Sequence, residues 1–188
     1  MKNVLLAIAL FFICALQLKA QIPVNNGNAA QSLDKIEFMG LSLGDNDITA
    51  FGSLLEDNGY TLLGKRDDST MYKGVFNNLA AQVMVVPFDD SENVKDVVIF
   101  LENLNPTKAG NLYAELLQKF MTKYQNYKYD TYVDRDGSHT ATFTNNAGFL
   151  ALQASVIGMG KCRISIFYCT KPATDTNTNS GGIGVDDL

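Results

Sequence analysis

The sequence contains few of the residues that catalytic and metal sites require. One histidine, His139, occurs in 188 residues, and two cysteines, Cys162 and Cys169, lie outside the N-terminal apolar run. A catalytic triad needs a base with oriented partners, and a tetrahedral zinc site needs four ligands. No G-x-S-x-G stretch occurs either. We therefore predict no catalytic residue, no metal site and no cofactor, and we interpret His139 as a residue at the edge of a turn.

Basic residues are scarce and scattered. The chain has 15 Lys and Arg against 20 Asp and Glu, which gives a net charge of −5. Without a Lys/Arg cluster it lacks the electrostatic footprint of a protein that binds nucleic acid. We therefore exclude nucleic acid as the main partner.

Only one apolar run is long, and it spans Val4 to Leu16, after Lys2 and before a short polar stretch that ends at Ala20. A membrane span needs about 20 apolar residues, so this layout is typical of a secretory signal peptide. We predict cleavage after Ala20, export to the periplasm or the cell exterior, and no transmembrane segment afterwards. The mature chain then has 13 basic and 20 acidic residues, a net charge of −7.

Cys162 and Cys169 lie seven residues apart in one strand-like stretch. At roughly 3.3 Å per residue they are about 23 Å apart and point to opposite faces. A disulfide needs Cα atoms within about 7 Å, so the two cannot bridge. We expect one buried thiol and one near a strand end, with an intermolecular disulfide through Cys169 as the alternative.

Hydrophobic periodicity predicts two helices, each followed by four strands. Residues 36–43 alternate as a strand, and Asp47 then caps a short helix with Phe51 and Leu55 on one face and Gly59 at its end. A second helix begins at Asn105 and Pro106. Its apolar stripe recurs at every fourth residue: Leu112, Leu116, Phe120 and Tyr124. The strands are predicted at 60–67, 70–76, 80–88, 94–102, 127–135, 138–144, 149–157 and 162–170.

The order of these elements predicts an α+β fold. Two tandem α-β4 units, residues 35–104 and 105–170, form an antiparallel sheet with both helices packed on one face. Similar segments recur near 65 residues apart: "NN" at 77 and 145, and "VVIF" with "ISIF". We interpret this recurrence as an ancient duplication. Residues 21–34 and 171–188 are polar and are predicted to be a disordered leader and a disordered acidic tail.

Turn and loop residues allow further predictions. Asp136 and Gly137 indicate a two-residue hairpin turn, since both tolerate positive φ. The same loop is a poor match to a calcium site, because it lacks the first ligand and the closing glutamate. Ser69 and Thr70 follow Asp68 in a stretch that resembles a short O-glycosylation acceptor, but we prefer to interpret it as a plain turn because three residues carry little information. Cross-strand packing is the usual role of aromatic residues in strands, and an aromatic platform for a sugar or protein is the alternative for four tyrosines: Tyr124, Tyr127, Tyr129 and Tyr132.

The doubled unit resembles the architecture of the β-lactamase inhibitor proteins, and half of it resembles small outer-membrane lipoproteins of barrel assembly. The opening "FMGLSLGDNDITAFGSLLEDNGY" is similar to that of small secreted proteins of uncharacterised function from Gram-negative gut bacteria. The inhibitors carry internal disulfides and this chain carries none. The resemblance therefore implies a fold and not inhibition.

The strands of the second half predict one apolar and one polar sheet face. The polar face holds the candidate ligand-binding residues Lys128, Asp130, Thr142, Gln153 and Arg163. In the first half the Met84 face is also apolar, so the other half, the leader or a partner must cover it. We predict a secreted or periplasmic, non-enzymatic binding module for a protein or glycan. The alternatives are a carboxylate-dependent hydrolase and an envelope assembly or stability factor.

Overall fold

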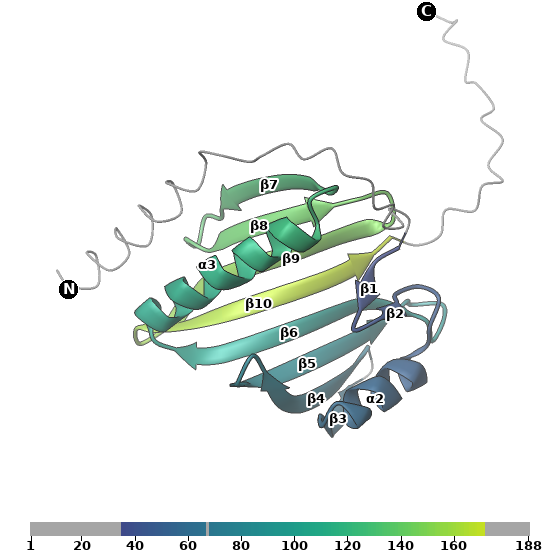
Figure 1. Cartoon of the computed structure of the whole chain (residues 1–188). Coiled ribbons are helices and arrows are strands. Elements are labelled where there is room, and N and C mark those ends of the chain that lie inside the picture. Colours follow the sequence, from purple (N-terminus) through teal and green to yellow (C-terminus); the bar gives the residue numbers. More distant parts are fainter. Residues whose placement is uncertain (1–34, 67, 172–188) are drawn as a thin grey trace, which may run out of the picture.

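The computed structural model describes residues 35–66 and 68–171, which form an α+β protein around one large antiparallel sheet (Figure 1). The predicted signal peptide, the leader and residues 172–188 of the predicted tail lie outside the described residues. The elements are β1 (Glu37–Phe38), β2 (Leu41–Ser42), α2 (Ile48–Asp57), β3 (Thr61–Arg66), β4 (Ser69–Phe76), β5 (Leu79–Pro87), β6 (Val94–Leu104), α3 (Pro106–Lys123), β7 (Lys128–Val133), β8 (His139–Thr144), β9 (Gly148–Gly158) and β10 (Lys161–Thr170).

The large sheet has eight strands in the order β3-β4-β5-β6-β10-β9-β8-β7. Two four-stranded meanders therefore meet where β6 and β10 pair antiparallel. At this central pairing Ile99 lies opposite Ile166, Val98 lies opposite Phe167, and Phe100 lies opposite Ser165. The hydrophobic pattern predicted the strands but not their order in the sheet, because the β6–β10 pairing joins residues 58 to 73 positions apart.

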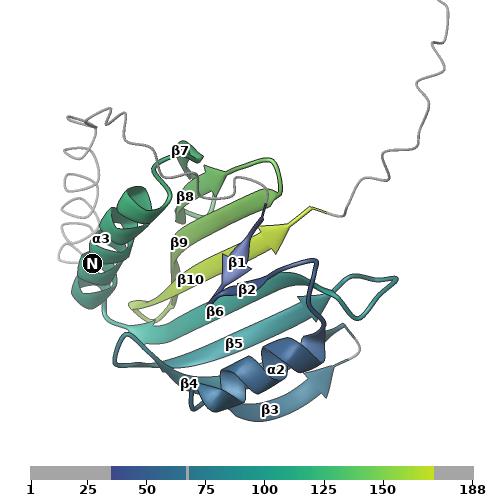
Figure 2. The ribbon, with the colours of Figure 1, turned by 45° about the vertical axis from the view of Figure 1, so that its right-hand side comes forward.

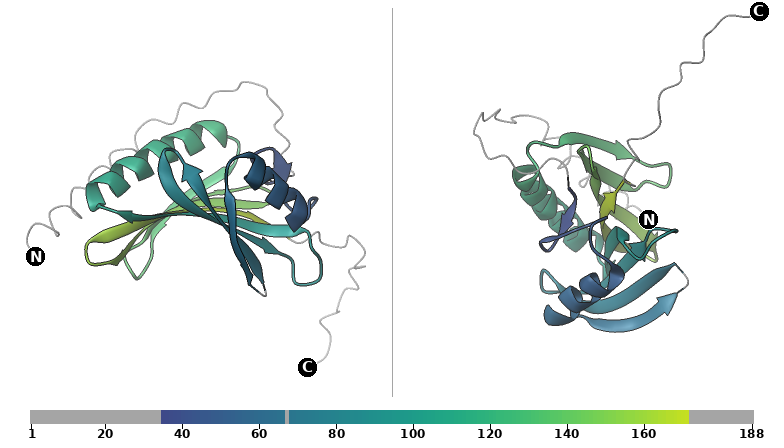
Figure 3. Two further views of the ribbon diagram at one scale, coloured as in Figure 1. Left: turned by 90° about the horizontal axis from the view of Figure 1, so that it is seen from below. Right: turned by 90° about the vertical axis from the view of Figure 1, so that its right-hand side faces the viewer.

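Both helices lie on the same side of the sheet (Figure 3). Helix α2 contacts β3 and β5, and α3 contacts β9 and β10. The predicted apolar stripes are confirmed, since Phe51 and Leu55 of α2 are fully buried and the α3 residues are at most 8% exposed: Leu112, Leu116, Phe120 and Tyr124. The buried core thus lies between the helices and one sheet face.

Both helix starts are as predicted. The carboxylate of Asp47 accepts a hydrogen bond from the Ala50 N–H at 2.8 Å, and the Asn105 side chain accepts one from the Lys108 N–H at 2.8 Å. These bonds satisfy backbone donors that the first turn leaves without a partner. Gly59, after the end of α2, has a φ of 81°, in the left-handed region that the prediction required.

The prediction of a single strand over residues 36–43 is wrong. The segment folds back as the β1–β2 hairpin, because Met39 and Gly40 adopt φ values of 50° and 89°. The apolar positions change phase between Phe38 and Leu41, which is the signal of the turn. The hairpin lies over the sheet between α2 and α3 (Figure 2), where the Phe38 ring contacts that of Tyr168 at 5.3 Å.

The predicted two-residue turn at Asp136-Gly137 is also wrong. Only Gly137 has positive φ, and the loop is wider, with the Gly137 N–H donating to the Asp134 carbonyl at 2.9 Å. A two-residue turn occurs instead at Asn77 and Asn78, whose φ values are 49° and 61°. It joins β4 to β5.

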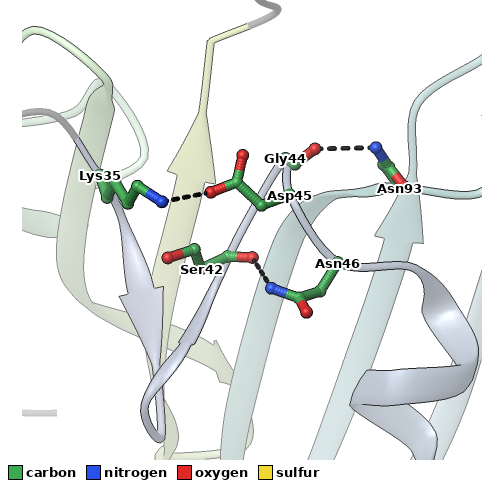
Figure 4. A network of polar contacts seen from close by, with 6 residues as sticks. All are labelled: Lys35, Ser42, Gly44, Asp45, Asn46 and Asn93. Atoms are coloured by element: carbon green, nitrogen blue, oxygen red, sulfur yellow. Dashed lines mark hydrogen bonds and ion pairs between the residues drawn. The ribbon is translucent and has the colours of Figure 1, made fainter.

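A polar network fixes the loop between β2 and α2 (Figure 4). The Asn93 amide donates to the Gly44 carbonyl at 2.9 Å, and the Asn46 amide donates to the Ser42 carbonyl at 2.9 Å. Backbone bonds between this loop and the start of β6 complete the attachment. The loop therefore holds the β1–β2 hairpin against the large sheet.

The first and last described residues meet at one loop. The carbonyl of Lys35 accepts a hydrogen bond from the Asn145 amide at 3.3 Å, and the Lys171 N–H donates to the Ala147 carbonyl at 2.8 Å. Asn145 and Ala147 both belong to the connection between β8 and β9. The first and last described residues therefore lie at the same corner of the fold.

Candidate functional site

The sheet face opposite the helices, called the open face below, is covered by no helix among residues 35–171 as described (Figure 3). One row of side chains crosses it through consecutive cross-strand pairs. These five residues, the apolar row, come from β4, β5, β6, β10 and β9: Met71, Met84, Val98, Phe167 and Ala151. Val98 and Ala151 are shielded by their neighbours, whereas the two methionines and Phe167 are half-buried.

The apolar row continues into predicted ligand-binding residues. Ala151 pairs with Thr142 on β8, and Thr142 pairs with Asp130 on β7. The Met84 face of the first half and the polar face of the second half, which the sequence analysis treated separately, are therefore parts of one surface. This surface is apolar where the row crosses β4, β5, β6, β10 and β9, and it is polar at β8 and β7.

Gln153 belongs to the next row of the open face, between Ser165 and Thr140. Its amide nitrogen lies 3.4 Å from the Thr140 hydroxyl and 3.5 Å from a carboxylate oxygen of Asp134. Thr140 also donates to that carboxylate at 3.3 Å. The predicted strand 127–135 contains Asp134, but Asp134 was not among the candidate ligand-binding residues; its place two residues after Tyr132 was the signal that it shares this face.

Arg163 lies on the open face, but its charge is already paired within the fold. Its guanidinium forms an ion pair with Glu102 of β6 and lies 5.5 Å from the centre of the Phe100 ring. Its Nε atom is buried without a hydrogen-bond partner. Both side chains of the ion pair are about one third exposed, at 35% and 32%. Arg163 thus stabilises the β6–β10 contact, and Glu102 and Phe100 are the partners that sequence reasoning missed.

Lys128 and Asp130 lie on β7, an exposed strand at the edge of the sheet. The Asp130 carboxylate accepts a hydrogen bond from the backbone N–H of Thr131 at 2.8 Å. That donor would otherwise be available to an additional strand, so Asp130 occupies part of the sheet edge. Lys128 pairs with Thr144 of β8. The structure thus gives Asp130 a local backbone role.

The four tyrosines do not form one platform. Tyr124 is buried, and burial raises its pKa to about 12. Tyr129 lies with its ring 5.1 Å from that of Phe143 on the helix side. Tyr132 is 49% exposed and belongs to the open face, where it pairs with Thr140. Strand alternation sends Tyr129 and Tyr132 to opposite faces, so Tyr129 has the packing role that aromatics in strands usually have and the alternative of a shared platform is wrong.

The two cysteines are free thiols, Cys162 buried and Cys169 partly exposed near a strand end, as predicted. Cys169 pairs with Asp96 across β10 and β6. Burial and the neighbouring Asp96 charge raise the pKa of the Cys169 thiol to about 12. Burial likewise raises the pKa of Asp96. Because disulfide exchange requires a thiolate, this environment disfavours an intermolecular disulfide through Cys169.

The remaining candidates for chemistry are dispersed. His139 begins β8, and burial lowers its pKa. Among the described residues no three His, Cys, Asp or Glu side chains are grouped to hold a metal ion. Thr70 is buried, so only Ser69 of the predicted acceptor stretch is accessible. In the same described part of the chain, no helix is long and apolar enough to cross a membrane.

Comparison of the chain with protein-family models, with curated proteins and with solved structures finds no match. The resemblances inferred from the sequence therefore stay predictions. The proposed function therefore depends on the geometry of the open face.

Proposed function

We propose that this protein is an exported, non-enzymatic binding module whose open face binds another protein. The observation that supports it most is the apolar row, which crosses five strands on a face that no described helix covers. Export is proposed from the apolar run at residues 4–16.

The chemistry of the apolar row favours a protein over a glycan. Met71, Met84 and Phe167 offer no hydrogen-bond donor for sugar hydroxyls, and methionine adapts its shape to varied apolar partners. Polar side chains border part of the row, including Gln153, Thr142 and Lys73, and Phe100 extends its apolar area. An apolar centre within a polar rim is the usual composition of a protein interface.

We also propose that the two halves are copies of one α-β4 unit. The pairing at the centre of the sheet supports this. When each residue of "VVIF" is matched with the corresponding residue of "ISIF", Ile99 matches Ile166, and these two lie opposite each other. The same match relates Val98 to Ser165 and Phe100 to Phe167. It therefore converts the pair of Val98 with Phe167 into the pair of Ser165 with Phe100, and both pairs occur in the sheet. This is the register expected of two related units around a two-fold axis.

Site-specific photo-crosslinking tests the binding face. A photoreactive side chain at Met84 in the open face is compared with one at Gln118 on the exposed side of α3. We expect a specific protein to crosslink through position 84 and not through position 118. The captured protein is then purified and its affinity measured by calorimetry.

The affinity measurement uses two matched charge insertions. Met84→Lys should weaken binding about tenfold or more, since it places a charge within the apolar interface and hot-spot changes commonly cost 2 kcal/mol or more. Gln118→Lys should leave the affinity unchanged. Equal crosslinking from both positions, or an affinity that Met84→Lys does not alter, would contradict the proposal.

A further inference from the structure

The turn between β9 and β10 carries a concentration of exposed apolar side chains. Val156 is 62% exposed, Ile157 is 39% exposed, and Met159 is fully exposed at the apex. These residues, with Gly158 and Gly160, form what we call the apolar tip. Exposed apolar side chains that cluster in this way commonly mark a contact with another molecule.

The backbone conformation at the apex of the apolar tip is unusual for methionine. Gly158, Met159 and Gly160 have φ values of 104°, 49° and 70°. Elsewhere the non-glycine residues with positive φ are Asn77, Asn78 and Asn103 and one further methionine, Met39 in the β1–β2 turn. A methionine here adopts a disfavoured conformation and also exposes its whole side chain to water. Its full exposure distinguishes Met159 from Met39, which is 46% exposed in the comparable turn, and a contact outside the described residues would remove the Met159 side chain from water.

The groups behind the apolar tip are polar and include a cation. Lys161 directly follows the tip and donates to the Asn103 side chain at 3.2 Å. The nearby carboxylate of Glu102 is neutralised by Arg163. Residues 155–161 contain no acidic residue, so the negative charge of the chain lies elsewhere.

We propose that the apolar tip inserts into the interfacial region of a lipid bilayer. A protein pocket would normally fix its ligand through directed polar contacts, and no polar side chain occurs between Val156 and Gly160. A bilayer requires no such contact. The ladder between β9 and β10 ends at the pair of Gly158 with Lys161, so the backbone of Met159 and Gly160 must stay near water and headgroups. Insertion is therefore shallow, with Lys161 at headgroup level.

The position of the apolar tip suits this role. Strands β9 and β10 connect it to the opposite end of the sheet (Figure 1), and Lys35 and Lys171, the first and last described residues, both bind the loop between β8 and β9 there. Ten residues of β10 correspond to roughly 30 Å. Neither end of the described chain therefore obstructs the approach of the apolar tip to a membrane.

The absence of tryptophan from the sequence permits a direct test. Met159→Trp places a single fluorophore at the apex, and Val75→Trp places one at a 65% exposed position on β4 as the matched control. The full chain is mixed with vesicles of phosphatidylcholine, alone or mixed with phosphatidylglycerol. We expect the emission of Trp at 159 to shift to shorter wavelength and to be quenched by lipids brominated in their acyl chains. The emission at position 75 should not change.

Because the fluorophore reports its own surroundings, binding of vesicles through residues 4–16 would not imitate insertion at position 159. A second variant, Val156→Ser with Ile157→Ser in the Met159→Trp chain, should reduce the shift. Unchanged emission of Met159→Trp with both vesicle types would overturn the proposal. A shift that depends on protein concentration without vesicles would also overturn it, since it would indicate contact with a second copy.

Discussion

Cys169 and Asp96 form a contact in which each side chain alters the protonation of the other. The thiol donates a hydrogen bond to the carboxylate, while burial and the Asp96 charge disfavour the thiolate. The raised pKa means that the thiol loses its proton only as the pH rises towards about 12. At neutral pH Cys169 is therefore a hydrogen-bond donor and a poor nucleophile.

The rate of Cys169 alkylation measures the effect of the raised thiol pKa. At pH 8 an ordinary thiol is partly ionised, so iodoacetamide should modify Cys169 about a thousandfold more slowly in the native protein than in the unfolded chain. Asp96→Asn removes the negative charge and should accelerate the reaction. Mass spectrometry of the Cys169 peptide gives the rate separately from Cys162. Equal rates in the native and unfolded protein would refute the assigned pKa.

At the scale of single elements, the two asparagine pairs at 77 and 145 differ in conformation. Asn78 has a φ of 61° in a two-residue turn, whereas Asn146 does not adopt positive φ. Alanine is disfavoured by roughly 1 kcal/mol in the left-handed region, and asparagine much less.

Alanine substitution distinguishes the two turns. Asn78→Ala should lower the free energy of unfolding by about 1 kcal/mol, whereas Asn146→Ala should change it by less than about 0.5 kcal/mol. Asn78→Gly should be neutral or stabilising, because glycine accepts positive φ without strain. Urea denaturation followed by circular dichroism measures all three. A loss at Asn146 as large as that at Asn78 would mean that the turns are held in the same way.

Local signals predicted the elements better than they predicted the site. Asn105 and Asp47 caps, the α3 stripe and strand alternation depend on neighbouring residues, so the sequence revealed them. The β1–β2 hairpin was missed because its apolar residues alternate on each side of the turn, and the change of phase between Phe38 and Leu41 was not used. The Arg163 ion pair with Glu102 could not be predicted, since it requires the pairing of β6 with β10.

At the scale of the whole molecule, the β6–β10 pairing makes the two meanders one sheet. Ile99 and Ile166 are both fully buried at its centre. Their side chains belong to a core that contains residues from both halves and both helices. We therefore expect the halves to unfold together.

Truncation at this pair tests that cooperativity. Ile166→Ala should lower the free energy of unfolding by about 2–5 kcal/mol and Ile166→Val by about 1 kcal/mol, because each loses buried surface and leaves a cavity. The same two substitutions at Ile99 should lower the free energy of unfolding by similar amounts. Circular dichroism and tyrosine fluorescence should give coincident urea transitions in each variant, as for a two-state domain. Val75→Ala, at an exposed position, should have little effect. Two separated transitions would show that the halves fold independently.

The loop between β8 and β9 binds the residues at both ends of the folded part, Lys35 and Lys171. A short peptide could therefore connect these two positions without crossing the sheet. New termini could then be opened at the exposed Asn77-Asn78 turn. The order of the strands along the chain is thus separable from their order in the sheet, and the protein is suited to circular permutation.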